Sequence, residues 1–173
     1  MNIVLIGYRC TGKSTVGRIL SKKLGWNFVD TDELIEKKEG KSIEEIVSEK
    51  GWREFRRIEK EVIEEVSRYR NQVISTGGGA VLDKENRERL KKNGFIVWLR
   101  AKPETIKERM LRDKKRPSLT GKAPEEEIEE VLKEREPIYR ECSDLIIDTD
   151  HICQKKIAER IIEDARKFIW KAF

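Results

Sequence analysis

Short apolar runs alternate along the chain with longer segments in which apolar residues recur every three to four positions. A short apolar run between two helical segments is typical of a parallel strand that is covered on both faces. The pattern predicts five strands, at residues 3–6, 28–29, 73–74, 95–99 and 145–147. It predicts helices at residues 14–24, 43–69 with a break near Gly51, 84–92, 103–112, 124–141 and 153–170. The expected fold is therefore α/β, a doubly wound five-stranded parallel sheet flanked by helices.

A chain of 173 residues is of the size of one domain, so we expect residues 1–173 to form a single unit. One segment, residues 113–123, lacks clear periodicity between two predicted helices. We expect this segment to be a mobile lid.

The charged residues narrow the choice of partners. The 38 basic and 33 acidic residues give a formal charge of +5 and are finely interleaved, which is typical of solvated helix faces. We therefore expect no nucleic-acid partner. No apolar run approaches the ~20 residues of a membrane span, so we expect no membrane partner either. The three cysteines are an odd number without C-x-x-C spacing, which predicts free thiols and a cytoplasmic location.

The first predicted strand runs into the sequence GYRCTGKST, residues 7–15. Its Gly7-x-x-x-x-Gly12-Lys13-Ser14 spacing is the P-loop pattern, in which backbone amides and a helix N-terminus surround phosphate oxygens. Lys13 would reach the β- and γ-phosphates, and the Ser14 hydroxyl would ligate Mg²⁺. The alternative is a glycine-containing turn with a solvated lysine. Four fixed positions match in a strand-loop-helix context, and this favours nucleotide binding.

Ligands of such sheets collect beyond the carboxyl ends of the strands. Asp30-Thr31-Asp32 follows the second predicted strand. Asp30 could hold Mg²⁺ through water, and Asp32, which points the same way if the backbone stays extended, could accept a proton from an attacking hydroxyl. Alternatively, Thr31 or Asp32 caps a helix that begins at Glu33. The residues alone leave both interpretations open.

A glycine triplet, Gly77, Gly78 and Gly79, follows the third predicted strand. Three successive glycines cost backbone entropy, so we expect them to serve a positive φ or a very close approach by another molecule. Backbone amides exposed there could bind an oxygen-rich small molecule.

Two arginines and a basic run complete the candidate residues. Arg56 and Glu59 lie three positions apart in FRRIE, and Arg135 lies in KEREPIYRE; an ordinary ion pair would explain either arginine. Together with the two aspartates they also suit a substrate that is both acidic and hydroxylated, because guanidinium groups bind carboxylates in a fork. The run at residues 112–116 is either solvated, binds nucleic acid, or brings Arg116 onto a migrating phosphoryl group when a lid closes.

Taken together, these motifs resemble the shikimate kinase family over nearly the whole chain. The resemblance is carried by GYRCTGKS, DTD, FRRIE, TGGG, KKRP and REPIY, in this order. It implies a fold like that of the nucleoside monophosphate kinases. It also implies transfer of the γ-phosphoryl group of ATP to the 3-hydroxyl of shikimate, giving shikimate 3-phosphate and ADP in aromatic amino-acid biosynthesis.

The resemblance also implies roles for individual positions. Lys13, Asp32 and Arg116 would act in catalysis, Ser14 and Asp30 would hold Mg²⁺, and Glu59 would orient Arg56. The residues implied to bind ATP are Cys10, Thr11, Gly12, Lys13, Ser14, Thr15, Arg109, Arg116 and Gln154. Those implied to bind shikimate are Asp32, Arg56, Gly77, Gly78, Gly79 and Arg135.

Two other functions remain as alternatives. A related small-molecule kinase such as gluconate kinase would share the loop and lid without needing the pair of arginines. A non-enzymatic nucleotide-binding or nucleic-acid-binding domain would instead use the basic run. We expect the protein to act as a monomer on small molecules.

Overall fold

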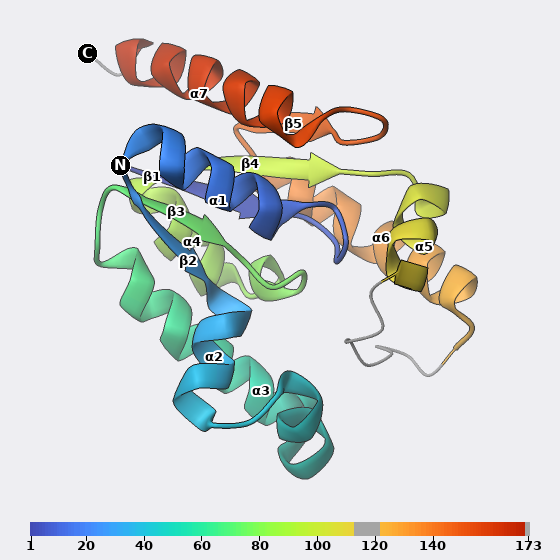
Figure 1. The fold of residues 1–173 in the computed structure, drawn as a ribbon. Coiled ribbons are helices and arrows are strands. Elements are labelled where there is room, and N and C mark those ends of the chain that lie inside the picture. The colour runs from blue at the N-terminus through green and yellow to red at the C-terminus, as the bar shows by residue number, and fades with distance from the viewer. Residues whose placement is uncertain (113–121, 172–173) are drawn as a thin grey trace.

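The computed structural model of the chain describes residues 1–112 and 122–171. Its sheet contains β1 (Asn2–Ile6), β2 (Asn27–Asp30), β3 (Gln72–Ser75), β4 (Gly94–Arg100) and β5 (Leu145–Asp148). All the pairings are parallel, in the order β2-β3-β1-β4-β5 (Figure 1). The predicted five-stranded parallel sheet is confirmed, whereas Arg116 and most of the expected lid lie outside the described residues.

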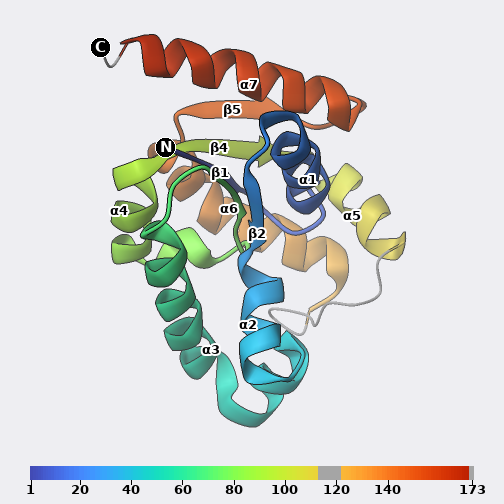
Figure 2. The same ribbon diagram turned by 60° about the vertical axis from the view of Figure 1, so that its left-hand side comes forward.

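Helices cover both faces of this sheet (Figure 2). They are α1 (Lys13–Leu24), α2 (Thr31–Glu39), α3 (Ile43–Ser67), α4 (Lys84–Asn93), α5 (Pro103–Arg112), α6 (Pro124–Cys142) and α7 (Gln154–Lys171). Alternate residues of β1 serve the two cores: Ile3 and Leu5 pack with α1 and α7, while Val4 and Ile6 pack with α3, α4 and α6. None of the helices in the described ranges is long and apolar enough to cross a bilayer. The three cysteines are free thiols, as expected.

The region after β2 differs from the sequence prediction. Helix α2 begins at Thr31, and the Asp30 carboxylate caps it by accepting hydrogen bonds from the backbone N–H groups of Asp32 and Glu33, at 3.1 and 3.4 Å. The expectations of an extended backbone at Asp32 and of a cap at Thr31 or Asp32 are therefore wrong. The sequence also did not predict the short 3₁₀ helix η1 (Ala80–Leu82).

Helix α2 and the first part of α3 project beyond the sheet (Figures 1 and 2). A capping box starts α3, because Ser42 and Glu45 each accept a hydrogen bond from the other's backbone N–H. The predicted break is present at Gly51, which has φ 79° and ψ 167° inside α3. The break turns the helix, and residues from both of its sides line the cavity described below.

Gly94, the first residue of β4, lies against α4 and β1. A Cβ added there would overlap the Leu90 carbonyl oxygen and lie 2.8 Å from Val4 Cγ2, although the φ of −117° suits any residue. We expect Gly94→Ala to lower the free energy of unfolding by about 1–3 kcal/mol, the usual cost of overpacking, as measured by urea denaturation. Gly40→Ala is the control, since Gly40 has φ +67° with open space around it and tests backbone strain alone. An unchanged free energy of unfolding in Gly94→Ala would contradict the steric explanation.

Candidate active site

The loop between β1 and α1 is shaped to receive an anion. Gly7 has φ +136°, and a Cβ there would overlap the Leu99 carbonyl oxygen, so only glycine fits. Gly12, at φ 93°, is the N-cap residue of α1. In the described structure, no side chain caps this helix, and its first turn contains no acidic residue. By contrast, α2 and α3 both have acidic first turns and side-chain caps. The N–H groups that begin α1 thus keep the positive end of the helix available to a phosphate.

Lys13 is not a solvated lysine. Its side chain is buried, and Nζ donates hydrogen bonds to the carbonyl oxygens of Gly7 at 2.8 Å and Tyr8 at 2.7 Å. The same loop is closed by Thr11, whose hydroxyl donates to the Tyr8 carbonyl at 2.9 Å. The ammonium group therefore lies along the inside of the loop, next to the space that phosphate oxygens would occupy.

Ser14 and Asp30 provide hard oxygen donors beside this loop. The Ser14 hydroxyl donates to Asp30 Oδ2 at 2.6 Å, while Oδ1 of the same carboxylate caps α2. A hydroxyl and a carboxylate suit Mg²⁺, which prefers oxygen ligands and retains several waters. No group of three or more His, Cys, Asp or Glu residues that could hold a metal occurs in the described part of the chain. A cation here would therefore need phosphate oxygens to complete its coordination.

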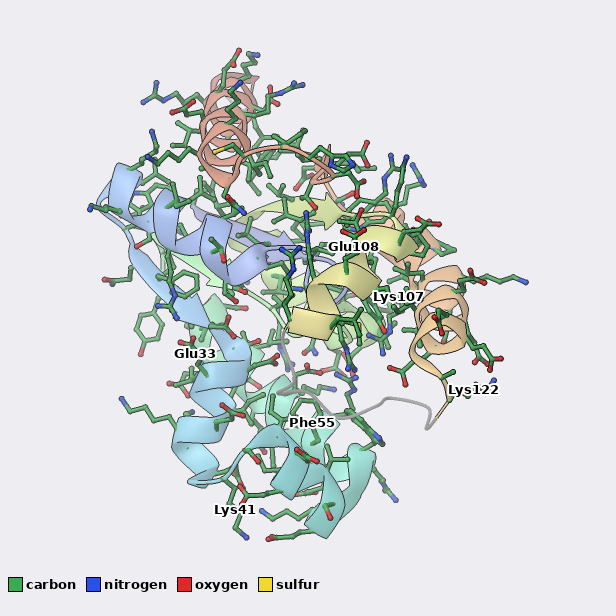
Figure 3. All side chains as sticks on the ribbon, turned by 45° about the vertical axis from the view of Figure 1, so that its right-hand side comes forward. Glu33, Lys41, Phe55, Lys107, Glu108 and Lys122 are labelled. Atoms are coloured by element: carbon green, nitrogen blue, oxygen red, sulfur yellow. The ribbon has the colours of Figure 1, made fainter. Side chains whose placement is uncertain are left out.

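A cavity of about 390 Å³ opens next to the P-loop, at the carboxyl ends of β1, β2 and β3. Helices α2 and α3 form one of its walls, and Figure 3 labels Glu33 on α2 and Phe55 on α3. Eight of the predicted site residues share this cavity: its lining includes Ser14, Asp30, Asp32, Arg56, Gly77, Gly78, Gly79 and Arg135. The structure thus brings the phosphate loop, both aspartates and both arginines together.

The Arg56 guanidinium is held on several sides. Its Nη1 lies 2.6 Å from Glu59 Oε2, and its Cζ lies 5.6 Å from the Trp52 ring centroid and 5.3 Å from that of Phe55. Glu59 is only 1% exposed, so a surface ion pair is the wrong interpretation of FRRIE. Burial raises the pKa of Glu59, and the charge of Arg56 opposes this rise.

The glycine triplet follows β3 and lies against four charged side chains. A Cβ on Gly79 would lie 2.6 Å from Arg56 Cζ, and one on Gly77 would lie 2.7 Å from Asp32 Oδ1. None of the three glycines has a positive φ, so the first of the two predicted explanations, a left-handed backbone, is wrong. The close approach is made by the protein's own side chains.

The amides of the triplet are also less available than expected. The Gly77 N–H donates to the Thr31 hydroxyl at 3.1 Å and is therefore already engaged. A Cβ on Gly78 would lie 3.4 Å from Arg135 Nη1, so the second arginine packs against the middle glycine. The triplet thus brings the loop close to Arg56 and Arg135.

Arg109 and Gln154 do not line the cavity. Arg109 donates from Nη1 to the Cys10 carbonyl at 3.1 Å and from Nη2 to the Thr149 carbonyl at 2.9 Å, linking the P-loop to the segment after β5. Gln154 is exposed at the first residue of α7, five positions after Thr149. Their implied contacts with the nucleotide therefore stay predictions.

Sequence reasoning missed several residues that shape the cavity. Arg9 lines it and is 7% exposed, and Trp52 and Phe55 provide its aromatic wall. Arg9 occupies a variable position of the P-loop, where the pattern gives no signal. Trp52 could have been found, because it lies four positions before Arg56 and such residues are neighbours on a helix; Phe55, directly before Arg56, gives no such signal.

Comparison with known proteins identifies relatives of this chain. The family model for shikimate kinase matches residues 9–166. A shikimate kinase of Thermodesulfovibrio yellowstonii is 48% identical, with 94% of both chains covered. One from Caldanaerobacter subterraneus is 45% identical, with 93% of this chain and 94% of the relative covered. The solved shikimate kinase of Acinetobacter baumannii, in complex with shikimate, superposes with a TM-score of 0.92 at 38% identity, covering 96% of this chain and 93% of that one.

Proposed function

The chain belongs to the shikimate kinase family, and from this premise we propose that it transfers the γ-phosphoryl group of ATP to the 3-hydroxyl of shikimate. The products would be shikimate 3-phosphate and ADP, in a step of aromatic amino-acid biosynthesis. The observation that carries the proposal is the single cavity into which Ser14 of the P-loop, Asp32, Arg56 and Arg135 all face. Such a cavity fits a small molecule with a carboxylate at one end and hydroxyls at the other.

Within this proposal, Arg56 and Arg135 bind the carboxylate of the acceptor. Guanidinium groups recognise carboxylates through paired N–H donors, which fixes orientation as well as affinity. The Glu59 carboxylate and the Trp52 and Phe55 rings hold Arg56 in place before the acceptor arrives. This arrangement directs the hydroxyl end of the acceptor toward Asp32 and the P-loop.

Phosphoryl transfer depends mainly on positioning and on stabilising charge. We assign Asp32 to bind the attacking hydroxyl and take its proton. Lys13 leaves the Gly7 and Tyr8 carbonyls for the phosphate oxygens, which the loop amides from Cys10 to Thr15 also hold. Arg116 adds positive charge from the segment that follows α5.

The donor set beside the loop also suits a cofactor. Ser14 and Asp30, the latter through water, would hold Mg²⁺, which neutralises phosphate charge when bound. We further propose that the enzyme acts as a monomer. Its free cysteines suit a reducing compartment, so we place it in the cytoplasm.

The proposal is tested by measuring ADP release against shikimate, quinate and gluconate, each with Mg²⁺ and ATP. We expect release that depends on shikimate and is abolished by Lys13→Ala, because that change removes the ammonium group from the phosphates. Release with gluconate alone would instead indicate a gluconate kinase. Salt-sensitive binding to DNA or RNA, without acceptor-dependent ADP release, would indicate the non-enzymatic alternative.

A further inference from the structure

One residue of the REPIY segment lies outside the cavity yet hydrogen-bonds a residue that lines it. Tyr139 is fully buried on α6, and its ring lies 5.6 Å from that of Trp98. Its hydroxyl donates a hydrogen bond to the Gly78 carbonyl. Tyr139 follows Arg135 by four positions, so both side chains emerge from the same face of α6.

Gly78 therefore lies between two contacts from one helix. Arg135 Nη1 would be 3.4 Å from a Cβ on this glycine, and the Tyr139 hydroxyl binds its carbonyl oxygen. The triplet has no side chains of its own with which to hold its position. On the other side, the Gly77 N–H donates to the Thr31 hydroxyl, which fastens the loop to α2.

We propose that Tyr139 is a positioning residue for the acceptor site: its hydroxyl fastens the glycine loop to α6 and thereby fixes the loop relative to Arg135. Tyr139 itself does not reach the cavity, so it acts on the acceptor only through Gly78 and Arg135. The assignment of the acceptor as shikimate rests on the proposed function, whereas the fastening of the loop does not.

The Tyr139 hydroxyl is suited to donate its hydrogen bond to Gly78 at every working pH. Burial raises the pKa of Tyr139 to about 12, with the charge and hydrogen bonding of the nearby Arg135 opposing the rise. The phenol therefore keeps its proton at any pH at which the enzyme works and remains a donor to Gly78. Its effect on acceptor binding is accordingly independent of pH over that range.

The test is Tyr139→Phe, which keeps the ring and removes the hydroxyl. We expect the KM for shikimate to rise about three- to tenfold, the usual worth of one hydrogen bond, with the KM for ATP unchanged. The matched control is Trp98→Phe, which disturbs the packing of the Tyr139 ring but leaves its hydroxyl bond. The control should lower the melting temperature without raising the KM for shikimate.

Two further readouts separate positioning from a merely structural role. In the Arg135→Lys background, Tyr139→Phe should raise the KM for shikimate by a clearly smaller factor than in the wild type, because the residue that Tyr139 positions has already been altered. Amide hydrogen exchange at residues 76–80 of the free protein should accelerate in Tyr139→Phe and not in Trp98→Phe. An unchanged KM with unchanged exchange, or effects that add fully with Arg135→Lys, would overturn the proposal.

These readouts also distinguish a failure of the proposed kinase function from a failure of the positioning role of Tyr139. If the wild-type protein shows no shikimate-dependent ADP release, the proposed function fails, and the exchange measurement still tests the fastening of the loop. If the wild-type enzyme is active and Tyr139→Phe matches it in both readouts, only the role of Tyr139 fails.

Discussion

Asp32→Asn is expected to lower kcat about 10²- to 10⁴-fold, the range usual for a positioned general base. The amide keeps nearly the same shape and can still hydrogen-bond an acceptor hydroxyl, but it cannot take up the proton. Asp32 is 9% exposed in the wall of the cavity, beside Glu59 and Gly77, so solvent is poorly placed to substitute for it. The measurement is the steady-state rate of ADP release at saturating ATP and shikimate.

The matched control for this variant is Asp83→Asn. Asp83 caps α4 by accepting a hydrogen bond from the Asn86 N–H, and it does not line the cavity. Asparagine caps helices about as well as aspartate, so the same chemical change should leave both kcat and stability nearly unaltered. A turnover of Asp32→Asn close to that of the wild type would remove Asp32 from the mechanism.

The sequence predicted the fold well because two strong signals agree. Apolar runs of strand length recur between segments of helical periodicity, and residues such as Ile3 to Ile6 alternate between the two cores. The break at Gly51 was also predictable, since glycine is the residue that most readily adopts the φ of 79° found there.

The prediction was weaker where one side chain makes hydrogen bonds to two different elements. Asp30 both caps α2 and accepts the Ser14 hydroxyl, and no spacing rule expresses such a double contact. The sequence left capping and ligand binding at DTD as alternatives, whereas the structure uses Asp30 for the cap and leaves Asp32 in the cavity wall. Local patterns can propose each function but cannot decide between them.

The glycine triplet illustrates a different limit. Its sequence indicated either a positive φ or a close approach to the backbone, but not which of the two, nor what would approach. The partners are Asp32, Glu59, Arg56 and Arg135, which come from three other elements of the chain. Contacts between residues so far apart in sequence follow from the packing of the whole fold, which a single sequence does not display.

Gly79→Ala is expected to raise the KM for shikimate about 10- to 100-fold, with a smaller effect on kcat and none on the KM for ATP. The new methyl group would lie 2.6 Å from Arg56 Cζ and 2.7 Å from its Nη1. Gly79 has φ −99° and ψ 0°, which alanine can adopt, so the guanidinium rather than the backbone must move. The size of the effect follows from a charged hydrogen bond, worth about 1.5–3 kcal/mol, because each 1.4 kcal/mol is tenfold in affinity.

Displacing Arg56 should also cost stability, because Glu59 is 1% exposed and would lose its partner in the interior. The double variant Gly79→Ala with Glu59→Gln separates the two effects: it should recover melting temperature, since a neutral amide needs no cation, but it should not recover the KM. Gly78→Ala is the matched control, because its methyl group would meet Arg135 Nη1 at 3.4 Å, a contact relieved by a few tenths of an ångström. An unchanged KM for shikimate in Gly79→Ala, with the fold intact, would contradict the displacement of Arg56.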